Sequence, residues 1–67
     1  MSTQASIKGN WHELKGNVRK QWGKLTDNDI EQINGDTEIL IGKLMKTYSK
    51  SREEAQREVE QFCRKDS

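Results

Sequence analysis

Apolar side chains in the first third of the chain recur every three or four residues, with polar positions between them. This spacing places them on one face of a helix. The apolar row consists of Ile7, Trp11, Leu14, Val18, Trp22 and Leu25. We predict a helix over about residues 10–23, with Asn10 as the candidate N-cap and Gly23 at its end.

A second, shorter helix is predicted from its capping residues. Thr26 is a favourable N-cap, and Asp29 stands three residues later, at the capping-box position. The Asp29 carboxylate also suits the positive end of a helix dipole. The helix is expected over about residues 27–33. It should end at Asn34 and Gly35, because both residues tolerate the left-handed conformation.

The second half of the chain predicts two more helices. Asp36 can cap a helix over about residues 37–48, in which apolar residues repeat every four positions. Ser51 and Glu54 form a capping box that starts a helix over about residues 52–64. The short connections between the four helices are typical of packed helix pairs.

The apolar rows of these helices predict one shared core. The residues expected to form it are Trp11, Leu14, Val18, Trp22, Leu25, Ile30, Ile33, Leu40, Leu44, Tyr48, Val59 and Phe62. We therefore expect an all-α fold, a four-helix bundle of two packed αα-hairpins. It should form a single domain over residues 1–67, ordered from about 7 to 64 and flexible over 1–6.

The second predicted hairpin repeats the first at an offset of 26 residues. Identical residues pair at this offset: Gly9 with Gly35, Leu14 with Leu40, Gly16 with Gly42, Lys20 with Lys46 and Lys24 with Lys50. This pattern favours an approximate internal duplication. Gly16 and Gly42 lie inside predicted helices, where each costs about 1 kcal/mol relative to alanine. We hypothesise that both glycines allow helices to approach closely.

Charge alternates along the chain in blocks, although the formal net charge is only +1. Residues 8–24 carry a net +4 and residues 27–38 a net −5, and the next blocks are again basic and acidic. Helices of opposite charge can attract each other, but an exposed ion pair contributes only about 0–1 kcal/mol. The blocks are therefore expected to guide helix pairing more than to stabilise the fold.

Composition narrows the classes of protein. Charged residues make up 34% of the 67 residues, and hydrophobic residues only 30%. No apolar run approaches the ~20 residues that span a bilayer, and residues 1–6 lack a signal-peptide pattern. The single cysteine, Cys63, fits a reducing compartment. We expect a cytoplasmic monomer without a membrane partner.

Residues with catalytic or metal-binding chemistry are few. His12 and Cys63 are the soft metal ligands of the chain, and neither belongs to a metal-binding spacing. Adjacent carboxylates such as Glu53 and Glu54 stand at helix starts, where the helix dipole explains them. A bundle of this size also has little room for a ligand pocket of ~300 Å³. We expect no cofactor, no metal, no catalytic residue and no enzymatic activity.

Basic residues on the first and third predicted helices form the candidate surface for nucleic acid or a protein partner. They are Lys8, Lys15, Arg19, Lys20, Lys24, Lys43, Lys46 and Lys50. Trp11 and Trp22 fall on the apolar row, so we expect them in the core and the basic faces in solvent. Nucleic-acid binding by these faces is therefore the less favoured alternative function.

The chain closely resembles the CsbD-like family of small bacterial stress-associated proteins. The resemblance rests on the pattern G-N-W-x-x-x-K-G-x-x-x-x-x-W-G-K-L-T-D-x-D from Gly9, then I-x-G and a glycine-containing helix, and covers about residues 7–62. It implies a hydrophilic, non-enzymatic general stress-response protein of unknown molecular mechanism. It also implies four helices in two hairpins, similar to SAM-like and helix-hairpin-helix bundles. The final CRKDS departs from the longer, aromatic-rich tail of an enteric relative, so functions of that tail are not implied.

Overall fold

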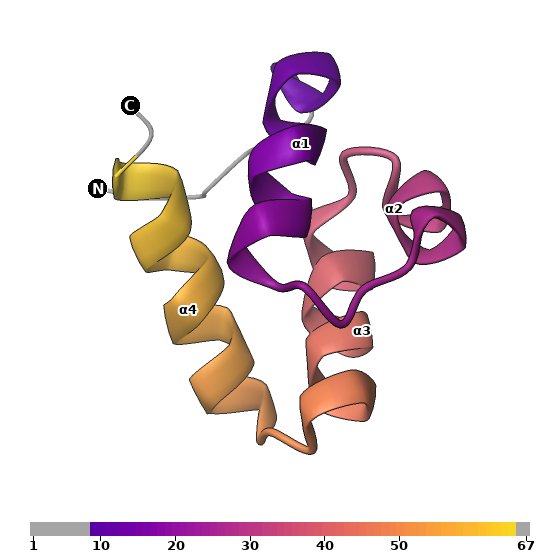
Figure 1. The fold of residues 1–67 in the computed structure, drawn as a ribbon. Helices are drawn as coiled ribbons and strands as arrows, with labels where there is room; N and C mark the ends of the chain where they lie inside the picture. The colour runs from indigo at the N-terminus through magenta and orange to yellow at the C-terminus, as the bar shows by residue number, and fades with distance from the viewer. Residues whose placement is uncertain (1–8, 66–67) are drawn as a thin grey trace.

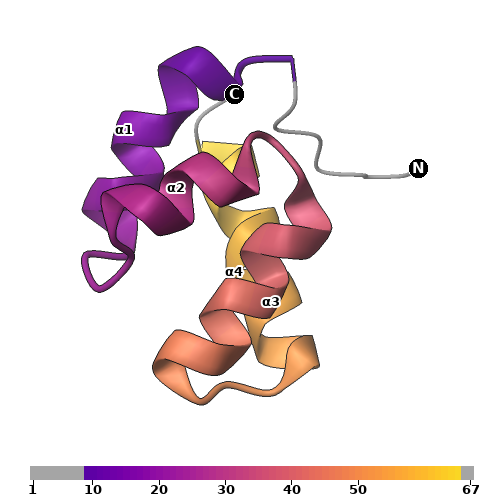
Figure 2. The ribbon, with the colours of Figure 1, turned by 90° about the vertical axis from the view of Figure 1, so that its right-hand side faces the viewer.

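The computed structural model describes residues 9–65, which form four helices joined by short connections. The helices are α1 (Trp11–Gln21), α2 (Asp27–Ile33), α3 (Thr37–Tyr48) and α4 (Arg52–Lys65). Helices α3 and α4 lie side by side as a hairpin, and α2 crosses near the start of α3 (Figures 1 and 2). The described part of the chain is therefore all-α, as the sequence predicts.

Local hydrogen bonds define α2, whose predicted bounds are confirmed. The backbone N–H of Asp29 donates to Thr26 Oγ1 at 3.1 Å, and the Thr26 N–H donates to Asp29 Oδ2 at 3.0 Å. Asn34 and Gly35 have φ values of 43° and 82°, so the chain leaves the helix through the left-handed region. The capping box and the left-handed stop predicted from sequence are both present.

The predicted caps of α3 and α4 also form. Asp36 Oδ1 accepts a hydrogen bond from the Glu38 N–H at 3.0 Å. Ser51 Oγ accepts from the Glu54 N–H at 3.1 Å, and Glu54 Oε1 accepts from the Ser51 N–H at 3.4 Å. At the other end of α3, Ser49 adopts a left-handed φ of 55°, which the sequence does not signal.

Helix α1 is shorter than predicted. The Asn10 side chain makes no capping hydrogen bond, so the expected side-chain cap is wrong. The Asn10 carbonyl instead accepts a hydrogen bond from the Leu14 N–H at 2.8 Å, which is the first i to i+4 backbone hydrogen bond of the helix. The helix ends at Gln21 rather than Gly23, because Trp22 turns to an extended φ of −124° and ψ of 80°.

One apolar core joins the four helices. Its buried members are Val18, Trp22, Leu25, Ile30, Ile33, Leu40, Ile41, Leu44, Ala55, Val59 and Phe62. Trp11, Leu14 and Tyr48, which we expected in the core, are only partly buried and pack against its edge. Ile41 and Ala55 were missing from the predicted set. Ile41 is buried because α3 packs against both α2 and α4, which gives it a wider buried face.

The hypothesis of close helix approach at Gly16 and Gly42 is wrong. Both glycines are exposed, and a Cβ added to either would meet no heavy atom within 4 Å. No Cα atom of α1 lies within 8 Å of a Cα atom of α3 or α4. Helices therefore do not pack at these glycines, and the internal duplication stays a prediction from sequence.

Candidate functional site

Two of the basic candidate residues are paired with acidic residues of α2, and a third, Lys50, is paired with Glu58 of α4. Arg19 of α1 forms an ion pair with Asp27, the first residue of α2. Lys43 of α3 lies with its Nζ 3.1 Å from Asp29 Oδ1 and also donates to the Gln32 side chain. The basic blocks of α1 and α3 thus face the acidic α2, which lowers the positive charge that these residues offer to a ligand.

The other basic candidates differ in their surroundings. Lys15, Lys20 and Lys46 are exposed, and no ion pair or hydrogen bond of their side chains occurs within residues 9–65. Lys24 Nζ lies 5.4 Å from the centre of the Tyr48 ring, and its backbone N–H donates to Tyr48 Oη at 3.1 Å. Lys8 lies outside the described residues. Within residues 9–65, Lys15, Lys20 and Lys46 are therefore the exposed lysines available for an interaction surface.

Trp22 forms a junction between the end of α1 and the middle of α4. Its side chain is 3% exposed, and its ring centre lies 5.2 Å from that of Phe62 at a tilt of 53°. Its Nε1–H donates to Glu58 Oε1 at 3.1 Å. The other oxygen, Glu58 Oε2, lies 2.7 Å from Lys50 Nζ in the connection between α3 and α4. We call Trp22, Glu58 and Lys50 the Trp22 junction.

The Trp22 junction takes Trp22 and Lys50 out of the candidate nucleic-acid surface, because Trp22 is buried and Lys50 is paired with Glu58. Burial of Trp22 removes it from any base-stacking surface, and Trp11 is only partly exposed. Glu58 was not among the residues predicted from the sequence, although its position carries one signal. Glu58 stands directly before Val59 and four residues before Phe62, so it borders the apolar row of α4.

Ionisable groups at the contacts between elements have shifted pKa values. The ion-paired hydrogen bond with Lys50 holds the pKa of Glu58 below 4.5, with a further contribution from the Trp22 hydrogen bond. The same contact with Glu58 raises the pKa of Lys50 above 10.5. The pKa of Asp29 lies below 3.8, first because the Thr26 N–H donates to it and then because Lys43 does. Both carboxylates are therefore stabilised in their charged forms.

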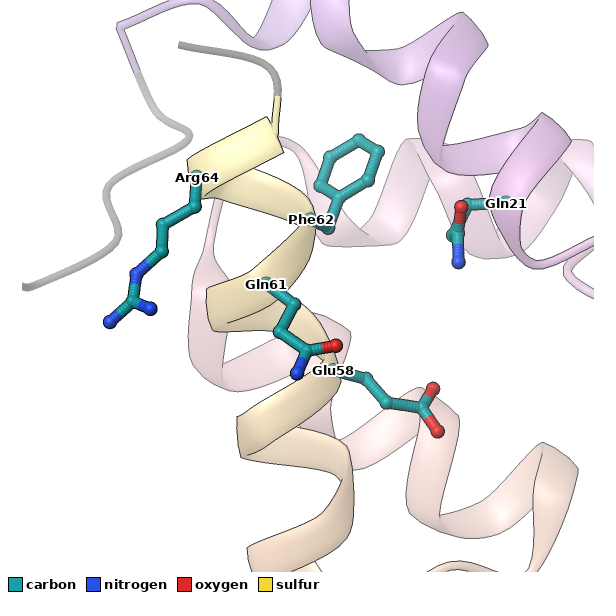
Figure 3. A pocket seen from close by; sticks show the side chains of 5 residues that line it. All are labelled: Gln21, Glu58, Gln61, Phe62 and Arg64. Atoms are coloured by element: carbon teal, nitrogen blue, oxygen red, sulfur yellow. The ribbon is translucent and has the colours of Figure 1, made fainter.

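A shallow hollow lies beside the Trp22 junction, between α1 and α4 (Figure 3). Its volume is about 250 Å³, below the ~300 Å³ at which ligand pockets usually start. Gln21 from α1 faces Glu58, Gln61 and Phe62 from α4 across the gap, whereas the Arg64 side chain extends away from it. The hollow therefore lies between the end of α1 and the C-terminal half of α4.

Candidate metal ligands are dispersed in the described part of the chain. His12 is exposed on α1 and Cys63 is partly buried on α4. Across residues 9–65, no three side chains of the His, Cys, Asp or Glu type gather closely enough to hold a metal ion. Within the same residues, no helix has both the length and the apolar character needed to cross a bilayer.

Comparison with known proteins gives a family for the chain. The family model described as CsbD-like matches residues 5–57, which include α1, α2, α3 and the start of α4. The chain belongs to the CsbD-like family. This CsbD-like protein thus has the capping residues of α2 and α3 and the aromatic end of α1 inside the region that defines its family.

Curated relatives match most of the CsbD-like protein. A UPF0337 protein of Protochlamydia amoebophila is 48% identical over 56 residues, which cover 84% of this chain and 85% of the relative. A UPF0337 protein of Pseudomonas aeruginosa is 45% identical over the same length, with 84% and 86% covered. The UPF0337 protein YjbJ of Escherichia coli K12 is 45% identical over 51 residues, with 76% and 74% covered. No solved structure matches the chain significantly.

Proposed function

We propose that this CsbD-like protein is a non-enzymatic, cytoplasmic protein of the bacterial general stress response, and that it acts as a folded monomer. Membership of a stress-associated family over residues 5–57 supports the proposal. The observation that carries the folded form is the single core shared by α1 to α4, with a mean hydropathy of only −1.13 for the chain. The few apolar side chains are gathered inside rather than dispersed along a solvated chain.

The surface of the protein suits accumulation to high concentration. Charged side chains of both signs alternate on it, and ion pairs such as Lys43 with Asp29 connect neighbouring elements. A mixed charged surface without a large apolar patch favours solubility. Ile39, at 39% exposed, is the only large hydrophobic residue exposed in the described part of the chain. Such a protein can become abundant under stress without aggregating.

Complementation of a deletion strain tests the proposal. The gene is deleted in its bacterium, and survival is measured after osmotic and heat challenge. Wild type and the Gly16→Ala variant, which keeps every buried contact, should restore survival. Trp22→Ala, which removes the aromatic contact between α1 and α4, should fail to restore it at equal protein level. Normal survival of the deletion strain, or full rescue by Trp22→Ala, would refute a folded stress-response protein.

Nucleic-acid binding is tested separately, because Lys15, Lys20 and Lys46 remain exposed and unpaired within residues 9–65. NMR spectra are recorded at low salt with excess duplex DNA and with single-stranded RNA, since phosphate-driven binding is strongest there. We expect unchanged spectra, because ion pairs already engage Arg19 and Lys43. Shifts that follow α1 and α3, and that disappear in Lys20→Gln, would favour the nucleic-acid alternative instead.

A further inference from the structure

Helix α1 is attached to the rest of the protein differently from the other helices. The backbone of α3 lies close to both α2 and α4, whereas α1 comes within 8 Å, Cα to Cα, of α2 only. The hollow beside Gln21 separates α1 from α4 (Figure 3). In Figure 1, α1 lies at the open upper end of the α3–α4 hairpin, between the ribbons of α4 and α2. Side chains, and not close backbone packing, hold α1 on α3 and α4.

Few contacts provide this attachment. Val18 of α1 is buried, as are Trp22 and Leu25 of the α1–α2 connection, and Trp22 lies against Phe62 of α4. The Arg19 ion pair with Asp27 is more than half exposed on both sides, so water screens it strongly. Glu58 contributes the hydrogen bond that connects the Trp22 indole to α4. Within residues 9–65, the Trp22 junction attaches the end of α1 to α4, and the hydrogen bond from the Lys24 N–H to Tyr48 Oη attaches the α1–α2 connection to α3.

Glu58 joins three elements through one carboxylate. Its two oxygens receive Trp22 Nε1–H from the end of α1 and Lys50 Nζ from the α3–α4 connection. The other ionisable groups nearby are Glu54, one turn earlier on α4, and Tyr48 at the end of α3, and both favour the charged form of Lys50. Protonation of Glu58 removes the charge that Lys50 pairs with and weakens the acceptor of the indole hydrogen bond.

We propose that α1 is a lid on the α3–α4 hairpin, held closed by the Trp22 junction and released by acid. Opening moves Trp22 away from α4 and exposes Phe62, against which its ring lies, to solvent. The hairpin keeps its capped ends, because its caps lie within Asp36 to Glu54 and do not involve α1. Local opening of this kind is expected where few buried contacts hold an element.

The direction of the pH effect follows from the lowered pKa of Glu58. The unfolded or opened chain binds a proton at Glu58 at a higher pH than the closed chain does, so acid favours opening. The stabilisation is complete above pH 4.5, the ordinary value for this carboxyl, and is lost as pH falls through the lower value of the closed form. Release is therefore expected below pH 4.5 and not at neutral pH.

Native-state hydrogen exchange of the full chain tests the lid. Protection factors of single amides, which correct for the intrinsic effect of pH on exchange, are measured by NMR at neutral pH and below pH 4.5. We expect α1 amides to lose protection in acid while the α3 and α4 amides keep theirs. Equal loss in all helices would show that the fold opens as one unit, and would overturn the proposal.

Matched variants separate the junction from a general effect of charge. Glu58→Gln replaces the charged acceptor of the Trp22 indole with a neutral amide, so it should lower α1 protection roughly twofold to tenfold at neutral pH. Glu60→Gln, an exposed position on the same helix, should leave protection unchanged. If Glu58→Gln unfolds the chain, Trp22→Phe replaces it, because this variant removes the indole N–H that Glu58 accepts and keeps an aromatic ring. Equal protection in the position 58 or 22 variant and in Glu60→Gln would refute the lid.

Discussion

Replacement of Gly16 and Gly42 by alanine should stabilise the protein. Both glycines lie inside helices, are exposed, and have no heavy atom within 4 Å of an added Cβ. Alanine is favoured over glycine in a helix interior by about 0.8–1.0 kcal/mol. The two sites are on different helices without a shared contact, so their effects should add to about 2 kcal/mol. For a chain of this length, that corresponds to a rise in Tm of about 8–16 °C.

Urea and thermal unfolding followed by helical circular dichroism measure this gain. Gly35→Ala is the matched control, because Gly35 has a φ of 82° and a side chain there costs roughly 1–2 kcal/mol. The control should therefore unfold at lower urea concentration than wild type. Unchanged or lower stability of the Gly16→Ala, Gly42→Ala double variant would refute the reasoning. It would mean that the helices approach each other at these positions after all.

Four further changes test the packing, the caps and the charges. Trp22→Ala should cost about 3–5 kcal/mol, and a native-like melt by circular dichroism would contradict burial of Trp22. Thr26→Ala should cost about 1 kcal/mol in urea unfolding through loss of the α2 cap, and an unchanged midpoint would contradict the capping box. Ser49→Gly should add roughly 0.5–1 kcal/mol by the same assay, because glycine adopts the left-handed φ without strain, and a loss would refute this. Acid titration should lower stability once pH falls below 4.5, since Glu58 and Asp29 have lowered pKa values in the folded chain, and a flat profile would exclude these contacts.

Short-range interactions explain why α2 and the caps of α3 and α4 are predictable from sequence. Thr26 and Asp29 bond to each other across three residues, and Asp36 bonds to the N–H of Glu38 two residues later. The left-handed φ of Gly35 likewise depends on its own lack of a side chain. Such contacts need no knowledge of distant parts of the chain.

The end of α1 was not predictable in this way. The sequence indicated Gly23 as the stop, but the helix ends earlier because Trp22 turns out of the helical conformation. In that position the indole reaches Glu58 and Phe62, which are 36 and more residues away along the chain. Helical periodicity shows that Trp22 is apolar and on the buried face, but not which element it will meet.

The sequence pattern also did not predict which acidic residues the basic residues would pair with. Alternating charge blocks favoured attraction between neighbouring helices, and the structure pairs Arg19 with α2 and Lys43 with α2. Lys50 was grouped with the other lysines as a candidate surface residue, yet it pairs with Glu58 at the Trp22 junction. Residue type identified the available charges, whereas the tertiary fold decided which of them were neutralised.

Exchange of the two indole protons with solvent tests most directly whether Trp22 joins α1 to α4. In NMR spectra at neutral pH, the Trp22 Nε1–H should exchange slowly and show nuclear Overhauser contacts to Phe62, because it donates to Glu58 at 3.1 Å. The Trp11 Nε1–H should exchange faster, because Trp11 is only partly buried. Equally fast exchange of both indole protons, without a contact between Trp22 and Phe62, would contradict the Trp22 junction.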